Sequence, residues 1–588
     1  MRLILVTLLA ALALPGQTSP DWVKRSNENT QILLRLEAKY EPEGAARMGI
    51  RGLDEQITIP SADRPERARR DFTAARQELE TRLAAEQDPL VKQDLEILIK
   101  TCDRNIHSSS AYEHALLPYD NAGETIFGGM RALLDDQIAA ERRPAAVVRL
   151  RKYTGIEPGY KPVTLLTEQI FEDKMKNQPA LAGPAKVEVE KDLGNTREYV
   201  EGIGQLLEKY HLQGWQEPYS KLKEQLAQYD DFVRQTVLPK ARTDFRLPPE
   251  LYTINLENTG VDYPIDELAG MAHQQFTELQ REMQQIAERV AKEHGWDSSD
   301  YREVIHRLKQ DQLTGDTILP HYEKRLADIE QIIRDNRLVT LPTRPAIIRL
   351  ASAAETAQQP APHMVPPPLI NNHGERGEFV LPLQTKGEGG KTLKYDDFTF
   401  AAASWTLTAH EARPGHELQF SAMVERGVSL ARALFAFNST NVEGWGLYAE
   451  WMTLPYMPDD GKLISLQLRL LRSARAFLDP QLQQGKTTPA EAMQVLEKDV
   501  VLSPAFATEE VERFTFRMPG QAVSYFDGYN RLLELRHDTE KALGSNFNAQ
   551  AFHDFILAQG LLPPDLLRKA VMSVFIPSQQ HAAPPTAD

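Results

Sequence analysis

A short segment of the sequence combines two histidines with a glutamate. Glu411 directly follows His410, and His416 comes six positions after His410. Two imidazole groups can hold a zinc ion, and a carboxylate beside them can take a proton from the water molecule that attacks a substrate. The segment therefore predicts a zinc-dependent hydrolase, with His410 and His416 as metal ligands and Glu411 as the general base.

The spacing of the two histidines requires an interruption of the helix that carries them. In an ideal helix, residues six positions apart fall about 120° short of two full turns, so the two rings would point apart. Pro414 lacks an N–H group and disfavours helical angles at the residue before it, and Gly415 tolerates dihedral angles that other residues avoid. We therefore expect the backbone to break there and to bring His416 back toward His410. The alternative is an accidental histidine–glutamate pair beside a helix stop.

A carboxylate that could complete the site lies further along the chain. Glu443 follows His416 by 27 positions, which is enough for a turn and an antiparallel helix. Glu450 comes seven residues later, on nearly the same helical face. We favour Glu443 as the third metal ligand and expect Glu450 to orient a histidine or to carry a solvated charge. The pattern Thr440-x-x-Glu443 also fits a capping box, in which the glutamate only satisfies a backbone N–H group.

The motifs around these residues resemble those of a known family. Three stretches are similar to the signatures of the bacterial family of unknown function DUF885: 410–419 (HEARPGHELQ), 443–450 (EGWGLYAE) and 519–525 (PGQAVSY). The arrangement also resembles that of gluzincin metallopeptidases, which use two histidines, a glutamate base and a glutamate ligand from a following helix. The resemblance implies Zn²⁺ bound by the two histidines and Glu443, with Glu411 as the base.

Two positions depart from the pattern of the family. Glu417 and Gln483 stand where the family often has histidines. A neutral amide at position 483 can donate a hydrogen bond, but it cannot carry a positive charge. This second departure supports an alternative, in which the chain is a helical binding protein with a degenerate site.

Residues in and around the third motif could contact a substrate. Hydrolysis of a peptide builds negative charge on the carbonyl oxygen, and the phenol of Tyr525 is a suitable hydrogen-bond donor to it. Tyr529 shares the same helical face, and the alternative for both tyrosines is a place in the apolar core. Arg517 could grip a substrate carboxylate with its guanidinium group, or form an ordinary surface ion pair. A stripe of arginines is expected to be solvated or salt-bridged: Arg469, Arg472 and Arg475.

The first residues indicate the cellular compartment, and the composition restricts the possible partners. Residues 1–19 combine one positive charge, an apolar run of about a dozen residues and a small-residue exit, which fits a secretory signal peptide. The run is too short to span a bilayer, so we expect an exported protein, periplasmic or secreted, without a stable membrane anchor. The 588 residues carry a formal net charge of −16, which disfavours nucleic acid as a partner. A single cysteine, Cys102, excludes an internal disulfide.

The rest of the chain has the composition and periodicity of helices. Ala, Leu, Glu, Gln, Lys and Arg dominate several segments, which are expected to be helical: 63–100, 187–210, 215–237, 265–293 and 322–337. Strand-like runs are scarce, and the best candidates are 337–343 and 377–383. The segment 343–394 is rich in Pro, Gly and Asn and is expected to be irregular. These patterns predict an all-α, mostly helical fold with a few short strands, and the resemblance described above implies a gluzincin-like architecture.

Four parts are expected along the chain. They are a signal peptide (1–19), an N-terminal helical region (20–240), a catalytic helical domain with the metal site (241–576) and a flexible tail (577–588). The expected function is that of an exported zinc metallopeptidase with short peptides as substrates. An amide or ester hydrolase that uses the same metal site on other bonds is a further alternative. The sequence does not indicate an oligomeric state.

Overall fold

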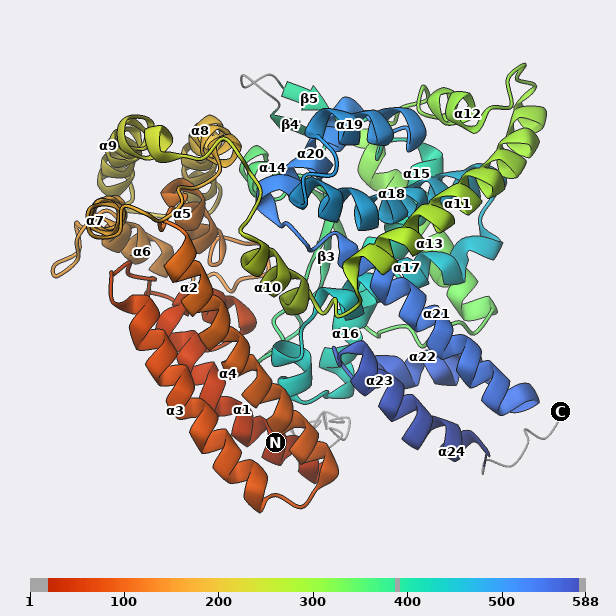
Figure 1. Ribbon diagram of the computed structural model, residues 1–588, viewed down its shortest axis with the longest axis horizontal. Helices are drawn as coiled ribbons and strands as arrows, with labels where there is room; N and C mark the ends of the chain where they lie inside the picture. Colours follow the sequence, from red (N-terminus) through yellow and green to blue (C-terminus); the bar gives the residue numbers. More distant parts are fainter. Residues whose placement is uncertain (1–19, 387–391, 581–588) are drawn as a thin grey trace, which may run out of the picture.

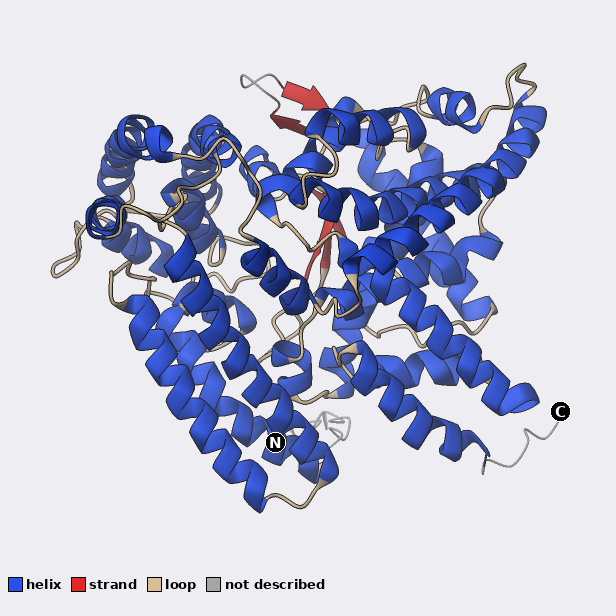
Figure 2. Ribbon diagram, viewed as in Figure 1, coloured by secondary structure: helices blue, strands red, loops and turns tan. Residues whose placement is uncertain are grey.

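The computed structural model describes residues 20–386 and 392–580 of the protein. Helices make up most of this part, and strands are few and short (Figure 2). The predicted all-α fold is thereby confirmed. No helix in these two stretches is long and apolar enough to cross a membrane. The predicted signal peptide and residues 581–588 of the predicted tail lie outside the described residues, whereas residues 577–580 belong to helix α24 (Ile576–Gln580).

The N-terminal helices occupy the left side of the molecule in Figure 1. Helices α1, α3 and α4 pack against one another, and α5 packs against α8. The bounds of these helices are α1 (Asp21–Tyr40), α2 (Pro42–Met48), α3 (Arg64–Ala85), α4 (Pro89–Ala115), α5 (Ala122–Arg131), α6 (Ala145–Tyr153), α7 (Val163–Asn177), α8 (Lys186–Lys209) and α9 (Gln216–Phe232).

The middle of the chain adds helices and the short strands. In the larger sheet, β3 (Glu378–Leu381) lies between β1 (Ile347–Leu350), which is parallel to it, and β2 (His363–Val365), which is antiparallel. Strands β4 (Gln384–Lys386) and β5 (Thr392–Lys394) form an antiparallel pair. The helices of this part are α10 (Pro249–Thr259), α11 (Ile265–His294), α12 (Tyr301–Leu308), α13 (Ile318–Asp335) and α14 (Ala353–Gln358).

The C-terminal helices carry the three motifs found in the sequence. Helix α11 packs along α18, and α17 packs along α21. The bounds are α15 (Ala401–Leu407), α16 (His416–Arg426), α17 (Ser439–Thr453), α18 (Asp459–Gln483), α19 (Pro489–Gln494), α20 (Pro504–Glu512), α21 (Val523–Leu543), α22 (Ala549–Ala558) and α23 (Pro564–Ala570), followed by α24.

Short π-helical and 3₁₀ turns join or extend these helices. π-helical turns are often found at functional sites, and two of them contain predicted site residues. The π-helical turns are η1 (Val233–Val237), η5 (Thr408–Ala412), η6 (Ala431–Phe435), η8 (Val495–Asp499), η9 (Arg513–Arg517) and η11 (Val571–Phe575). The 3₁₀ turns are η2 (Leu238–Lys240), η3 (Gly315–Thr317), η7 (Leu454–Tyr456) and η10 (Gly544–Asn546).

Most of the predicted helices are present, with boundaries shifted by a few residues. The segment 63–100, however, contains parts of two helices, α3 and α4. Asp88 caps the second helix, because its side chain accepts a hydrogen bond from the N–H group of Leu90. Pro89 fits the first turn of α4, where its missing N–H group would have no intrahelical partner.

The strand predictions are right in one place and wrong in another. The predicted strand 377–383 corresponds to β3. Residues 337–343 form no strand, because Arg337 adopts a left-handed conformation (φ 49°) just after α13 and interrupts the extended run. The segment 343–394, expected to be irregular, contains the short strands and α14 among its loops.

The apolar core joins early and late parts of the chain. One cluster of buried side chains contains Leu33 and Leu98 from the N-terminal helices together with Leu557 and Phe575 from the last helices. Removal of such side chains from water is the main favourable contribution to folding. The N-terminal helices are therefore packed against the helices that carry the motifs, and the predicted division at residue 240 stays a prediction.

Helices α17 and α21 cross at close range because glycines lie at the contact. A Cβ atom added to Gly528 would lie 1.9 Å from the carbonyl oxygen of Thr440. A Cβ atom added to Gly444 would lie 2.6 Å from the backbone of Gly528. Only glycine permits this approach of the two backbones.

We expect Gly528→Ala to lower the free energy of unfolding by about 1–3 kcal/mol, because the two helices must move apart to admit the methyl group. Gly194→Ala in α8 is the matched control, since nothing lies within 4 Å of a Cβ atom there. Alanine is the better helix former, so the control should be as stable as the unchanged protein or slightly more stable. Urea unfolding followed by circular dichroism measures both variants. Equal stability of the two variants would contradict the close crossing.

Candidate metal centre

The two predicted histidine ligands converge at an interruption of their helix. Helix α15 continues into η5, which carries His410 and Glu411, and the chain leaves helical geometry at Arg413 (φ −129°, ψ 135°). The Arg413–Pro414 peptide bond is cis, and α16 begins at His416. The ring centroids of His410 and His416 lie 4.6 Å apart, with an angle of 82° between the ring planes. The break expected at Pro414 is present, and the two imidazoles meet.

Gly415 and Trp445 shape the turn between the histidines. A Cβ atom on Gly415 would lie 1.8 Å from the carbonyl oxygen of His410, so this close approach of the chain to itself needs glycine. The indole Nε1 of Trp445 donates hydrogen bonds to the carbonyl oxygens of Pro414 (3.0 Å) and Gly415 (3.3 Å). The helix that carries Glu443 thus also fixes the turn.

Glu443 completes a cluster of three potential ligand atoms. Its Oε2 lies 3.5 Å from Nε2 of His410 and 3.3 Å from Nε2 of His416. Ligands at about 2.0–2.1 Å from a tetrahedral zinc ion are about 3.3–3.4 Å apart, so these separations fit two edges of such a site. The same oxygen is buried and has no hydrogen-bond partner among the described residues. A buried carboxylate oxygen without a partner is unfavourable, and a cation at the centre of the cluster would compensate for it.

Glu411 is a second carboxylate beside the histidines. One ligand atom from each of His410, Glu411 and His416 lies within 4.8 Å of the others, so distance alone makes Glu411 a rival to Glu443 as a ligand. The Glu411 carboxylate lies 4.0 Å from Nε2 of His410, further than that of Glu443. The shorter separations favour Glu443 as the ligand and leave Glu411 next to the cluster. Burial raises the pKa of the Glu411 carboxyl group.

The capping role considered for Glu443 is wrong. Helix α17 is capped by Asn438, whose side chain accepts a hydrogen bond from the N–H group of Asn441 (2.8 Å). Thr440 lies inside the helix, and its hydroxyl donates to the carbonyl oxygen of Thr259 (3.0 Å). The carboxylate of Glu443 instead faces the histidines.

Glu450 holds the ring of His410 in place. Its Oε1 lies 2.7 Å from Nδ1 of His410, and its Oε2 accepts a hydrogen bond from the hydroxyl of Thr406 (2.7 Å). Burial alone would raise the pKa of Glu450, but the guanidinium of Arg472, 3.6 Å away, and the His410 ring hold this pKa below its usual range. An ionised Glu450 can only accept, so Nδ1 of His410 carries a proton, and Nε2 is the nitrogen that faces Glu443.

The two imidazoles differ in their surroundings. A Cβ atom on Gly446 would lie 2.6 Å from Cε1 of His410, so α17 can pack against this ring only through a glycine. His416 has no equivalent of Glu450, because its Nδ1 is buried without a hydrogen-bond partner in the described stretches. His410 is therefore the more firmly oriented of the two.

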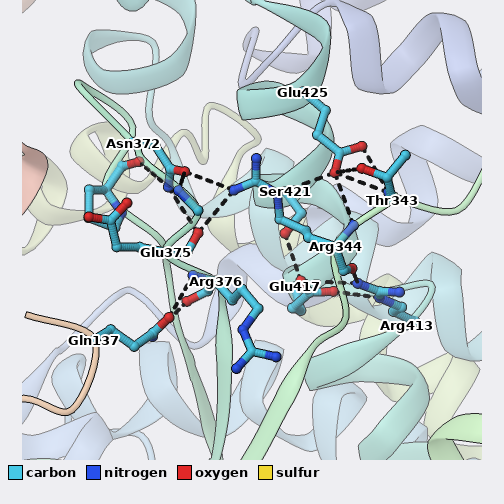
Figure 3. A network of polar contacts seen from close by, with 12 residues as sticks. Gln137, Thr343, Arg344, Asn372, Glu375, Arg376, Arg413, Glu417, Ser421 and Glu425 are labelled. Atoms are coloured by element: carbon cyan, nitrogen blue, oxygen red, sulfur yellow. Dashed lines mark hydrogen bonds and ion pairs between the residues drawn. The ribbon is translucent and has the colours of Figure 1, made fainter. Parts of the chain in front are cut away.

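A buried ion-pair network anchors the start of α16 (Figure 3). Nε of Arg413 donates to Glu417 (2.7 Å), and Nη1 donates to Glu330 of α13 (2.6 Å). Nη2 of Arg413 donates to the carbonyl oxygen of Arg344. Glu417 also accepts a hydrogen bond from Ser421 (2.6 Å). The residue that stands in place of a family histidine at 417 thus forms a structural ion pair beside the turn.

Tyr525 faces the cluster, whereas Tyr529 belongs to the core. The ring of Tyr525 lies almost parallel to that of His410, with centroids 6.3 Å apart. Its hydroxyl accepts a hydrogen bond from Arg513 (3.3 Å). Tyr529 is buried under the guanidinium of Arg469, 5.2 Å from its ring centroid. Only Tyr525 of the two is among the described residues that line the cavity next to the cluster.

Buried arginines surround Tyr525, and their burial was not predicted from the sequence. Of the two expectations for the stripe, solvation is wrong, because Arg469, Arg472 and Arg475 are 7%, 6% and 3% exposed. Salt bridges are present for Arg472, with Glu450, and for Arg475, with Glu510. The guanidinium of Arg475 lies 4.4 Å from the ring centroid of Tyr525 and pairs with Glu510. Arginines at every third position share one face of α18, and this face packs toward α21 rather than toward water.

Arg517 and Gln483 lie away from the cluster. Arg517 pairs with Glu512 (3.1 Å) and faces a neighbouring cavity, so the structure does not bring it to a substrate held at the histidines. The amide of Gln483 donates to the carbonyl oxygen of Phe514 (2.7 Å) and accepts from the N–H group of Leu247 (2.9 Å). Gln483 thus links two backbone segments. The absence of a histidine at this position leaves the contacts of His410, His416 and Glu443 unchanged.

A cavity of about 1030 Å³ opens onto the cluster. Glu411, His416, Glu443 and Tyr525 line it, together with residues of α2, α4 and the loop before β2. Ligand pockets of small molecules measure roughly 300–1,000 Å³, so this cavity has room for a short peptide but not for a folded protein.

Proteins of known structure share this fold. A protein from Colwellia psychrerythraea, described as a candidate lipoprotein, has a TM-score of 0.70 and 16% sequence identity, with 94% of this chain and 99% of that chain covered. A candidate lipoprotein of unknown function from Shewanella oneidensis has a TM-score of 0.63 and 18% identity, with 94% and 100% covered. No curated protein matches the sequence. A profile of the family described as bacterial protein of unknown function (DUF885) matches residues 42–571.

Proposed function

The chain belongs to the bacterial DUF885 family, and on this premise we propose that it is an exported zinc-dependent metallopeptidase that hydrolyses short peptides. One observation carries the proposal. Oε2 of Glu443 lies 3.5 Å from Nε2 of His410 and 3.3 Å from Nε2 of His416, which are the separations of tetrahedral zinc ligands. The cluster lies at the wall of a cavity with room for a peptide.

The donor set fits zinc. Two imidazoles and one carboxylate are a common ligand set of catalytic zinc sites, in which the fourth position is left for water or substrate. A zinc ion held there would polarise the scissile carbonyl group and lower the pKa of a water molecule. Glu450 supports this set, because it fixes the tautomer of His410 that presents the Nε2 lone pair.

Glu411 is the residue that we propose for the proton transfers. Its carboxylate is buried next to the two histidines and lines the cavity where the peptide would lie. It takes a proton from the attacking water and then delivers this proton to the leaving amine. Tyr525 donates a hydrogen bond to the carbonyl oxygen as negative charge builds there. Arg513 and Arg475 hold the tyrosine in place through its hydroxyl and its ring.

Export is part of the proposal. The first nineteen residues have the pattern of a signal peptide. The structural neighbours from Colwellia psychrerythraea and Shewanella oneidensis are described as candidate lipoproteins, and lipoproteins are exported. Both observations support a periplasmic or secreted site of action.

Metal analysis combined with peptide turnover tests the proposal. The purified protein should contain one zinc ion per chain and hydrolyse members of a library of short peptides. Dialysis against a chelator should remove both the zinc and the hydrolysis, and added zinc should restore them. Zinc with turnover of esters or other amides but not of peptides would favour the non-peptidase hydrolase. A chain without stoichiometric zinc would favour the degenerate binding protein.

We expect Glu450→Gln to weaken zinc binding by about 10- to 100-fold, because the amide no longer enforces the Nδ1–H tautomer of His410. Competition with a fluorescent chelator measures the affinity. Glu293 is exposed on α11, and Glu293→Gln is the matched control that should bind zinc like the unchanged protein. Unchanged affinity of Glu450→Gln would show that the carboxylate does not position the histidine.

A further inference from the structure

Two arginines of the N-terminal helices line the catalytic cavity without an acidic partner. Arg47 lies in α2 and Arg104 lies in α4, and both line the cavity that contains His416 and Glu443. Neither forms a hydrogen bond or an ion pair within the part of the chain that the structure describes. Arg413, in contrast, is paired with two glutamates.

Arg47 is the unpaired arginine within its neighbourhood. Arg131 and Arg349 repel it, but each of them is paired with Glu355, at 2.6 Å and 2.8 Å. Glu378, another acid in this neighbourhood, pairs with Arg349 (2.7 Å). Arg47 itself forms no ion pair, because Asp135 and Glu378 attract it only through space. A charge in this position is stabilised by any anion that enters the cavity.

Arg104 occupies a face of α4 that offers no carboxylate. Thr101, Asn105 and Ser108 lie on the same helical face and also line the cavity. Burial lowers the pKa of Arg104, and no acidic group offsets this effect. The N-terminal wall of the cavity therefore carries two uncompensated guanidinium groups.

We propose that Arg47 and Arg104 form the binding site for a carboxylate group of the substrate, so that the enzyme acts on short peptides that bring a free carboxylate into the cavity. A guanidinium group matches a carboxylate with two parallel hydrogen bonds. Arg47 is exposed and Arg104 is half-buried, so a substrate that enters the cavity can reach both guanidinium groups. The inference rests on the proposed peptidase function, of which it specifies the substrate.

Other charged groups near the cavity do not compete for this role. Glu37 also lies on the N-terminal wall, but its carboxylate forms no ion pair with either arginine. Arg517 faces the adjoining cavity, whose lining includes Glu124, Glu188 and Asp192. A wall with several acidic side chains would repel a substrate carboxylate. The anion site therefore lies at Arg47 and Arg104 rather than at the arginine favoured by the sequence.

The carboxylate can come from the C-terminus of the peptide or from an acidic side chain. Calorimetric titration of the Glu411→Gln protein, which should turn peptides over slowly, separates the two sources. The probes are trialanine with a free C-terminus, trialanine amide, and Ala-Asp-Ala amide. We expect the free acid to bind roughly 10- to 100-fold more tightly than trialanine amide. Binding of Ala-Asp-Ala amide as tightly as the free acid would identify the side chain as an accepted source.

Arg47→Met and Arg104→Met should each reduce the preference for the free acid, and the double variant should abolish it. Arg35 is exposed on α1 and does not line the cavity, so Arg35→Met is the matched control that should keep the preference. Thermal unfolding checks that each variant is folded. Equal binding of acid and amide by the parent protein, which needs no arginine variant, would overturn the inference. Absence of binding by either form, or a preference that survives in the double variant, would do the same.

Failure of this inference and failure of the peptidase proposal give different results. A chain that hydrolyses peptides with zinc but binds acid and amide alike retains the proposed function and loses the carboxylate site. A chain that prefers the free acid but hydrolyses no peptide retains the carboxylate site and loses the proposed function.

Discussion

Replacement of Glu411 by glutamine should lower peptide turnover by about 10²- to 10⁴-fold and leave zinc bound. Glutamine has nearly the same shape as glutamate but cannot take a proton from the attacking water. The Glu411 carboxylate lies 4.0 Å from Nε2 of His410, whereas that of Glu443 lies 3.5 Å from this atom and 3.3 Å from Nε2 of His416. Loss of the base should therefore affect kcat and spare the metal content. Steady-state kinetics and metal analysis of the same preparation measure both.

Glu443→Gln is the matched comparison, because it makes the same chemical change at the neighbouring carboxylate. It should lose zinc, and with it turnover, since an amide oxygen is a weaker zinc ligand than a carboxylate. Loss of the metal by Glu411→Gln together with its retention by Glu443→Gln would show that Glu411 is the ligand and Glu443 the base. Full turnover by Glu411→Gln would exclude this residue as the base.

The arrangement of the cluster could be predicted from the sequence because its determinants are local. Pro414 and Gly415 interrupt the helix between the two histidines whatever the rest of the fold does. Glu443 and Glu450 lie seven positions apart, so a helix that places one at Nε2 of His410 places the other near its Nδ1. Local geometry of this kind is contained in the spacing of a few residues.

The charges around the cluster could not be predicted, because burial is a property of the whole fold. The arginine stripe of α18 has the same spacing whether it faces water or the neighbouring helix, and the structure buries it around Tyr525. Arg47 and Arg104 lie hundreds of positions before the motifs, and no sequence signal connects them to the site. Arg517 lies close to the third motif in sequence, yet its side chain faces another cavity.

The fold shows the same division between local and long-range information. Helical composition and periodicity identified α8, α11 and α13. The break between α3 and α4 has a local signal in Asp88 and Pro89, a cap followed by proline. The close crossing of α17 and α21 depends on Gly444 meeting Gly528, and the sequence alone cannot pair glycines that belong to different helices.

Tyr525→Phe should lower kcat by about 10²- to 10³-fold with little change in KM or zinc content. The ring of Tyr525 lies beside that of His410, and the benefit of its phenol appears only as the carbonyl oxygen becomes negative. The hydroxyl accepts a hydrogen bond from Arg513, which orients it and leaves its proton for the substrate. Phenylalanine keeps the ring beside His410 and the contact with Arg475, so the packing is preserved.

Tyr529→Phe provides the control, because it makes the same change one helical turn away in the core. It should leave kcat unchanged and affect only stability. A purely structural role for Tyr525 would lower the unfolding midpoint and alter KM or zinc content together with kcat. An effect confined to kcat would instead assign the hydroxyl to the transition state, since only an interaction that strengthens there raises kcat without tightening substrate binding. Equal kcat values for Tyr525→Phe and the unchanged enzyme would show that the phenol has no role in the mechanism.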